Sequence, residues 1–141
     1  MATYLSSEQK KQPALKTADK YPYHIRLKDK AYFFIAAILQ PYVDKDTGET
    51  VDTVAIVTTD ANSLMRQIHN STNRMPTMLP DELAWEWMMD NLTEQWITEI
   101  ATYQIKASDM DAYKVAKDFR TTGCPSKAFV YSEVPELSYE V

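Results

Sequence analysis

The pattern of apolar and polar residues predicts strands in the first half of the chain. Residues 23–27 alternate as a half-buried strand does, whereas residues 31–39 are apolar at nearly every position and predict a strand buried on both faces. A β-branched run over residues 51–58 predicts a third strand after a polar turn. We expect these three strands to be antiparallel neighbours, with Ile35 and Ile56 in the core.

Helical spacing of apolar residues dominates the region that follows these strands. It predicts one helix over residues 61–69, a second over residues 81–89 and a third that begins at Thr93. Short strands are predicted at residues 103–106 and 113–116. The pattern therefore predicts an α+β fold in which helices pack on an antiparallel sheet.

Composition indicates a single domain and an intracellular protein. The chain has 141 residues, of which 45% are hydrophobic and 11% aromatic, and this is enough for one packed core. We assign residues 21–141 to this domain and residues 1–20, which are polar and contain Pro13, to a flexible leader. The longest apolar run is far shorter than the roughly 20 residues of a spanning helix, and the N-terminus lacks a signal-peptide core. We expect no membrane contact and a cytoplasmic location.

Charge and metal-ligand residues narrow the candidate partners. One cysteine and two histidines, scattered along the chain, predict no disulfide framework, metal site or cofactor. The net charge is −5, but residues 1–30 carry a balance of +4 and the remainder −9. The basic front is either a DNA-facing surface or a solvated leader, and both interpretations stay open. A phosphate site would need Arg26, Arg66 and Arg74 to come together on folding.

His69 and Arg74 are candidate functional residues because they flank a polar loop between two apolar segments. An imidazole can act as a general acid or base near neutral pH, but a histidine at a helix end also serves as a cap. The planar guanidinium of Arg74 can bind a phosphate or hold the loop by donating to a backbone carbonyl.

The order of several motifs resembles the SOS-response-associated peptidase (SRAP) family, which handles abasic sites in single-stranded DNA. The motifs are Tyr21-Pro22-Tyr23-His24-Ile25, the apolar Phe33 to Ile38, the polar Asp44 to Glu49, Thr58 to Asn62 with Ile68-His69, Arg74-Met75-Pro76 and Leu79-Pro80. The resemblance covers roughly residues 20–137. It implies an α+β fold with a mixed or antiparallel, partly barrel-like sheet core and flanking helices, here only the C-terminal portion of the family domain.

The resemblance also implies roles for three side chains. His69 would assist the opening of the abasic sugar and the turnover of the cross-link. Thr58 would contact that sugar, although a strand-end threonine is an equally good interpretation, and Arg74 would contact DNA. The family's nucleophile is a cysteine directly after the initiator methionine, whereas this chain begins Met1-Ala2. Cys124 is internal and lacks the α-amine that closes the thiazolidine ring, so we interpret it as a loop thiol.

Two functions of different class remain. In the first, the chain is a SRAP-type protein of the DNA-damage response that binds single-stranded DNA but is unable to cross-link to abasic sites alone. Family members have autopeptidase and lyase-like activities, but this chain lacks the cysteine after the initiator methionine. Whether the chain is an enzyme therefore stays open. In the second, it is a non-catalytic remnant or protein-interaction module with the same fold. Beyond DNA, the expected partners are a separately encoded N-terminal half or a second copy of the chain.

Overall fold

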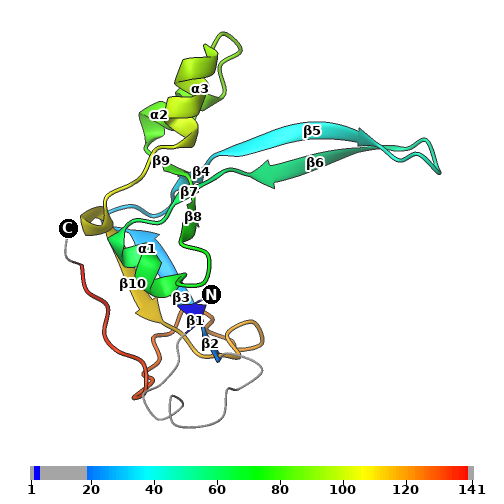
Figure 1. Cartoon of the computed structure of the whole chain (residues 1–141). Helices are drawn as coiled ribbons and strands as arrows, with labels where there is room; N and C mark the ends of the chain where they lie inside the picture. Colours follow the sequence, from blue (N-terminus) through cyan, green and yellow to red (C-terminus); the bar gives the residue numbers. More distant parts are fainter. Residues whose placement is uncertain (1, 4–18, 140–141) are drawn as a thin grey trace. The chain divides into compact units, whose positions relative to one another are not determined.

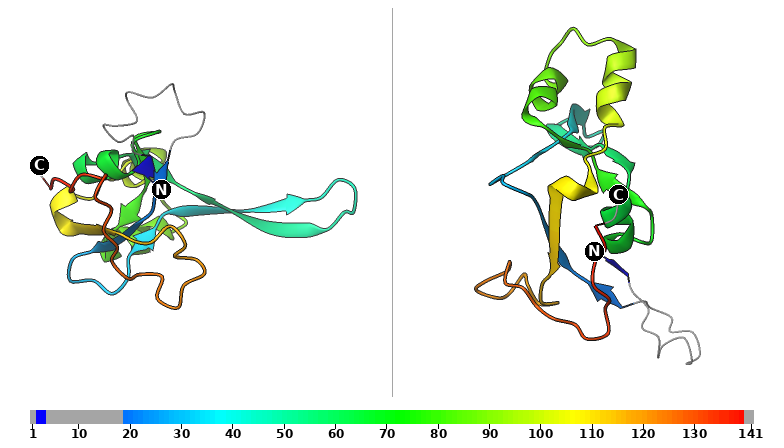
Figure 2. Two further views of the ribbon diagram at one scale, coloured as in Figure 1. Left: turned by 90° about the horizontal axis from the view of Figure 1, so that it is seen from below. Right: turned by 90° about the vertical axis from the view of Figure 1, so that its left-hand side faces the viewer.

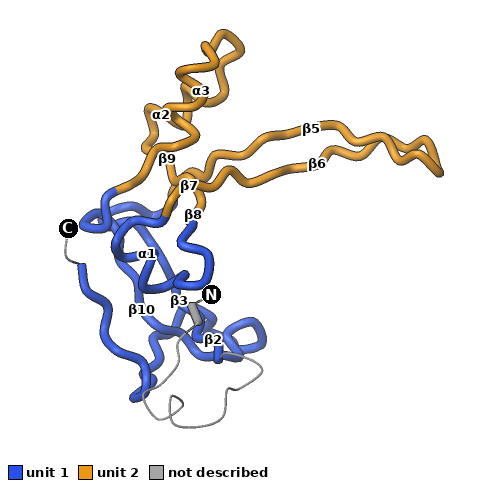
Figure 3. Tube along the Cα trace, viewed as in Figure 1, with its two compact units in different colours: residues 1–32, 61–75, 106–141 blue, residues 33–60, 76–105 orange. Residues whose placement is uncertain are grey.

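The computed structural model describes residues 2–3 and 19–139, and it confirms the α+β fold class (Figures 1 and 2). Most of the predicted leader lies outside the described residues. The chain divides into two compact units, each built from separate stretches of sequence (Figure 3). Unit 1 comprises residues 1–32, 61–75 and 106–141, and unit 2 comprises residues 33–60 and 76–105.

Unit 1 contains one helix, a 3-10 turn and two antiparallel strand pairs among its described residues. Its elements are β1 (Ala2–Thr3), β2 (Lys20–Tyr21), β3 (Tyr23–Leu27), α1 (Ser63–Ile68), η2 (Ala107–Asp109) and β10 (Met110–Lys114). β1 pairs with β2, and β3 pairs with β10 in a register that runs from Met110 opposite Leu27 to Lys114 opposite Tyr23. The expected pairing of residues 23–27 with residues 31–39 is therefore wrong.

The pairing of β3 with β10 follows from which side chains each strand can bury. Met110 and Ala112 of β10 are buried, and so is Leu27 of β3. These side chains share one face of the pair with Lys114, since successive residues of a strand point to opposite faces. Leu64, Met65 and Ile68 supply the buried apolar face of α1. The core of unit 1 thus joins segments that are far apart in the sequence, which local hydrophobic patterns cannot specify.

Unit 2 contains a long hairpin, a short strand pair and two helices. Its elements are β4 (Phe34–Ile35), β5 (Ala37–Val43), β6 (Thr50–Ile56), β7 (Thr58–Asp60), β9 (Met78–Leu79), α2 (Asp81–Trp87) and α3 (Glu94–Ala101). β8 (Arg74–Pro76) lies at the boundary between the units. β5 pairs antiparallel with β6, as expected, and β4 pairs antiparallel with β9.

The single strand expected over residues 31–39 is interrupted at Ala36. Its amide donates to the carbonyl of Thr77 at 3.0 Å, and its carbonyl accepts from the amide of Val57 at 2.9 Å. Thr77 in turn donates its own amide to the carbonyl of Val57 at 2.9 Å. Thr77 therefore joins the two strands at the base of the hairpin, and the long strand divides into β4 and β5.

The expectation that Ile35 and Ile56 lie in the core is wrong. Ile35 is 39% exposed and Ile56 is 59% exposed. The buried cluster of unit 2 is formed by Ala36, Leu79 and Ile100, with Leu83 and Trp87 among the partly buried side chains around it. The apolar pattern indicates a need for burial, but within the described part of the chain Ile56 stays mostly exposed and Ile35 is only partly covered.

Smaller differences concern the boundaries of elements. α2 ends at Trp87 rather than at residue 89, residues 103–106 form no strand, and β10 begins at Met110 rather than at residue 113. The earlier start of β10 follows from the alternation of buried Met110 and Ala112 with partly exposed residues. Among the described residues, no helix is both long and apolar enough to span a bilayer.

Candidate functional site

α1 fixes the position of His69, because both ends of this helix are capped. At the start, the side-chain oxygen of Asn62 accepts from the amide of Met65 at 2.9 Å, which satisfies one of the unpaired donors of the first turn. At the end, His69 is the C-cap residue, and its amide donates to the carbonyl of Met65 at 2.7 Å. The buried face of α1 anchors the helix in unit 1, so the helix presents His69 at a defined place.

The loop after His69 is closed by backbone hydrogen bonds. Asn73 adopts a φ of +52°, a left-handed conformation that asparagine tolerates better than most residues. Its amide donates to the carbonyl of His69 at 3.3 Å, and its carbonyl accepts from the amide of Ala61 at 2.9 Å. These contacts return the chain toward α1, so that Arg74 follows directly beside the histidine.

The structure brings His69 and Arg74 together through the backbone of the arginine. Nδ1 of His69 lies 2.9 Å from the carbonyl oxygen of Arg74. Because a carbonyl oxygen only accepts, Nδ1 carries the proton in this contact, and Nε2 of the neutral ring keeps its lone pair. The hydroxyl of Thr72 lies 3.2 Å from Nδ1 and 3.4 Å from Nε2. A half-buried imidazole held in this tautomer can accept a proton at Nε2 and return it.

The arginines contribute to this region in different ways. Arg26 donates to Oδ2 of Asp111 through Nε at 2.8 Å and through Nη2 at 2.6 Å, and this hydrogen bond raises the pKa of the guanidinium. Arg66 donates from Nε to the carbonyl of Ala61 at 2.9 Å. Arg74 is exposed. Arg26 and Arg66, two of the arginines considered for a phosphate cluster, thus make contacts within unit 1.

Thr58 belongs to unit 2, whereas His69 and Arg74 belong to unit 1. It is the first residue of β7 and is exposed, while its neighbour Thr59 is buried and donates from Oγ1 to the carbonyl of Thr102 at 3.2 Å. Since successive side chains alternate across a strand, the hydroxyl of Thr58 points away from the face that Thr59 buries. Its predicted contact with the sugar stays a prediction.

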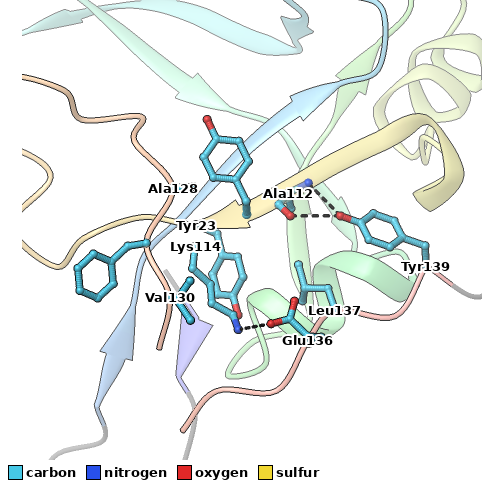
Figure 4. Close-up of a pocket in the computed structure, with 10 residues that line it drawn as sticks. Tyr23, Ala112, Lys114, Ala128, Val130, Glu136, Leu137 and Tyr139 are labelled. Carbon is cyan, nitrogen blue, oxygen red and sulfur yellow. Dashed lines mark hydrogen bonds and ion pairs between the residues drawn. The ribbon is translucent and has the colours of Figure 1, made fainter. Parts of the chain in front are cut away.

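A pocket in unit 1 contains polar groups that the sequence patterns did not single out. It has a volume of about 240 Å³, and Lys114 and Tyr139 are among its lining residues (Figure 4). The side chain of Lys114 is only 7% exposed; its Nζ donates to the carbonyl of Val134 at 2.8 Å and lies 3.3 Å from Glu136. The hydroxyl of Tyr139 accepts from the amide of Ala112 and donates to the carbonyl of Ala112, each at 3.2 Å.

These contacts hold the C-terminal segment against β10. The signal for Lys114 in the sequence is its place on the inward-facing side of β10, two residues after the buried Ala112, where a lysine needs a partner. Cys124 is exposed. Among the residues that the structure describes, no group of three or more His, Cys, Asp or Glu side chains is placed to hold a metal ion.

Comparison with known proteins identifies relatives of this chain. Over 97 residues it is 33% identical to the abasic site processing protein YoqW of Bacillus subtilis, an alignment that covers 69% of this chain and 42% of YoqW. It is 30% identical over 102 residues to the abasic site processing protein YoaM of the same organism, covering 72% of this chain and 43% of YoaM. The chain thus spans less than half the length of these relatives.

A solved structure supports the same assignment. The fold matches the crystal structure of a protein from Bacteroides thetaiotaomicron with a TM-score of 0.68 and 34% sequence identity, covering 82% of this chain and 48% of the other. The family model of the SOS response associated peptidase (SRAP) matches residues 8–122, well over half of the sequence. The chain belongs to the SOS response associated peptidase family.

Proposed function

We propose that this chain takes part in the processing of abasic sites in single-stranded DNA, with His69 as its proton-transfer group. The observation that carries this proposal is the imidazole of His69, which the carbonyl of Arg74 orients at 2.9 Å in a member of the SRAP family. The abasic site processing names of the Bacillus relatives support the substrate class.

The proposed step is the opening of the abasic sugar. Nε2 of His69 takes the proton of the anomeric hydroxyl, the bond between C1′ and the ring oxygen breaks, and a carbonyl forms at C1′. The ring oxygen then receives the proton from the imidazolium, so that atoms and charge balance. In this proposal the guanidinium of Arg74 contacts a DNA phosphate, and the hydroxyl of Thr58 contacts the opened sugar.

The 141-residue chain on its own is proposed to bind DNA without forming a stable cross-link. Its one cysteine, Cys124, lies inside the chain and has no free α-amine beside its thiol. Incubation with abasic single-stranded DNA should therefore leave no heat-resistant adduct on a denaturing gel. A robust adduct that disappears in Cys124→Ser would refute this part of the proposal.

The binding test measures by fluorescence anisotropy the affinity of the chain for a single strand that carries one abasic site. The affinity for the duplex of that strand with its complement is measured for comparison. We expect Arg74→Ala to weaken binding and to lower the salt dependence by about one phosphate contact. Arg120→Ala is the matched control, because Arg120 is also an exposed arginine of unit 1. Equal losses in the two variants would show that only the net charge matters, which would remove Arg74 from the site.

The role of His69 is tested by the rate at which an aminooxy reagent traps the abasic aldehyde. Only the ring-opened sugar reacts, so a chain that speeds opening should raise this rate. His69→Gln should abolish the increase while leaving DNA affinity close to that of the wild type. A variant that retains the full rate would exclude His69 as the proton-transfer group.

A second candidate function, a protein-interaction module, is favoured by the apolar surface of unit 2. Large apolar side chains such as Leu39, Val54 and Trp85 are each more than 60% exposed there. Contiguous exposed apolar surface is typical of sites that bind other proteins. Absence of DNA binding together with capture of a protein partner by this surface would favour the second candidate.

A further inference from the structure

The pocket that contains Lys114 lies at the end of β10, where two other segments run beside this strand. On one side Lys114 is opposite Tyr23 of β3. On the other side the carbonyl of Lys114 accepts from the amide of Phe129 at 2.8 Å, and Val115 forms an antiparallel bridge with Ala128. The described residues that line the pocket all belong to unit 1, so its geometry does not depend on where unit 2 lies.

The ammonium of Lys114 is buried but has few acceptors. The side chain is 7% exposed, and an ammonium carries three donors. Nζ donates to the carbonyl of Val134 at 2.8 Å and lies 3.3 Å from Oε1 of Glu136. The described part of the chain thus provides one short and one long contact for three donors. A charged group that is buried in this way favours an additional acceptor.

Glu136 is a weak counter-ion for this lysine. Its side chain is 93% exposed, and 3.3 Å is longer than the roughly 2.7–2.9 Å of a strong charge-assisted hydrogen bond. Figure 4 shows the carboxylate reaching Nζ from the C-terminal segment. Ion pairs that water can reach contribute little to stability. A carboxylate that enters the pocket can therefore take the place of Glu136, whose side chain then returns to water.

Aromatic side chains form much of the wall around this ammonium. They are Tyr23, Tyr113, Phe129 and Tyr139. Burial raises the pKa of Tyr23, and the charge of Glu136 adds to the rise, so the hydroxyl is a neutral donor close to that carboxylate. Aromatic side chains pack well against a planar ring in stacked or edge-to-face contacts. The wall therefore suits a ligand with an aromatic body.

We propose that this pocket binds a small aromatic monocarboxylate, whose carboxylate replaces Glu136 at the ammonium of Lys114 and whose ring packs against the aromatic wall. The volume of about 240 Å³ lies below the roughly 300–1,000 Å³ of sites for drug-sized ligands, so one ring and one carboxylate suit its size.

The charges at the pocket limit the ligand to one negative charge. Among the described residues that line it, Lys114 is the one cationic side chain and Glu136 the one carboxylate. A second negative charge on the ligand would be repelled by Glu136 and would find no second cation. His69 and Arg74 do not line the pocket, so the proposal is independent of the proposed role in DNA processing.

Binding is tested with sodium benzoate and the complete 141-residue chain, labelled with ¹⁵N, in the absence of DNA. The amide signals of Tyr23, Lys114 and Phe129 should shift in a saturable manner, whereas those of Trp85 and Trp96 should stay in place. Benzamide has the same shape without the charge and should bind at least about tenfold more weakly. Cyclohexanecarboxylate keeps the charge without the aromatic ring and should bind about threefold more weakly.

Two substitutions should change the affinity for benzoate in opposite directions. Lys114→Met keeps most of the apolar stem but removes the ammonium, and it should weaken binding at least about tenfold. Glu136→Gln removes the competing carboxylate from an exposed position and should tighten binding about twofold to fivefold. The matched controls are Lys127→Met and Asp118→Asn, which change the same charges at exposed positions of unit 1 outside the pocket. Each control should alter affinity by less than about 1.5-fold.

The sign of the Glu136→Gln effect decides the test even where Lys114→Met disturbs the fold. Tighter binding in Glu136→Gln, with unchanged affinity in Asp118→Asn, would support replacement of the counter-ion. Weaker or unchanged binding in Glu136→Gln would overturn the proposal. Equal affinities for benzoate and benzamide, or absence of saturable shifts at the pocket, would also overturn it.

Discussion

Thr77 should be a stability hot spot of unit 2, because one buried side chain joins two elements of this unit. It is fully buried, and its Oγ1 donates to the carbonyl of Ala101 at 2.8 Å. That carbonyl belongs to the last turn of α3, where backbone acceptors lack partners within the helix. Thr77→Val keeps the shape but leaves the carbonyl unsatisfied, which costs about 1–3 kcal/mol. The added methyl group offsets part of this cost, so we expect a net loss of about 1–2 kcal/mol.

Thr53→Val is the matched control for this prediction. Thr53 also donates to a backbone carbonyl, that of Gln40 at 2.7 Å, but it is exposed, so water can replace the lost donor. Its cost should stay within about 0.5 kcal/mol. Urea unfolding followed by tryptophan fluorescence reports on unit 2, since Trp85, Trp87 and Trp96 all lie there. With m of about 1–2 kcal/mol/M, Thr77→Val should lower the midpoint by about 1 M. Equal midpoints for the two variants would refute the assignment of Thr77 as the buried connection.

Two further predictions concern the core and the pH dependence. Ile100→Ala should lower the free energy of unfolding by about 2–5 kcal/mol, because Ile100 is 1% exposed. Ile56→Ala should lower it by less than about 1 kcal/mol in the isolated chain. Equal shifts of the two urea midpoints would contradict the burial described here. Burial, reinforced by a hydrogen bond to Glu133, raises the pKa of Tyr21 to about 12. The resulting stabilisation is fully present below the unfolded pKa of about 10 and is lost as the pH rises toward 12, so Tyr21→Phe should flatten this part of the pH–stability curve.

Local chemistry explains the parts of the structure that the sequence predicts well. The cap of α1 at Asn62 follows from a polar side chain before helical spacing of apolar residues. The turn of the hairpin follows from Asp44, whose carboxylate accepts from the amides of Asp46 and Thr47, and from Gly48 with a φ of +76°. Hydrogen bonds from those amides, that of Thr47 foremost, lower the pKa of Asp44. Each of these features depends on residues a few positions apart.

Features that depend on distant residues were not predictable in the same way. His24 pairs with Tyr113, and their rings stack with centroids 4.9 Å apart, although the residues lie at opposite ends of the sequence. The contact of His69 with Arg74 was only partly predictable, since the sequence indicated both residues but not that a carbonyl would orient the imidazole. The position of the Arg74 carbonyl depends on the left-handed conformation of Asn73. A short polar loop permits this conformation but does not require it.

The incorrect prediction for Ile56 carries information about assembly. An apolar run indicates that its side chains favour burial, but it does not say which polypeptide would bury them. Ile56 belongs to β6, and its side chain shares a face with Val54, both more than half exposed. If a second polypeptide covers this face, Ile56→Ala should be nearly neutral in the isolated chain but should weaken the complex. The effect of Ile56→Ala on the stability of the isolated chain and on the affinity of a complex therefore distinguishes a hairpin that stays exposed from one that a second polypeptide covers.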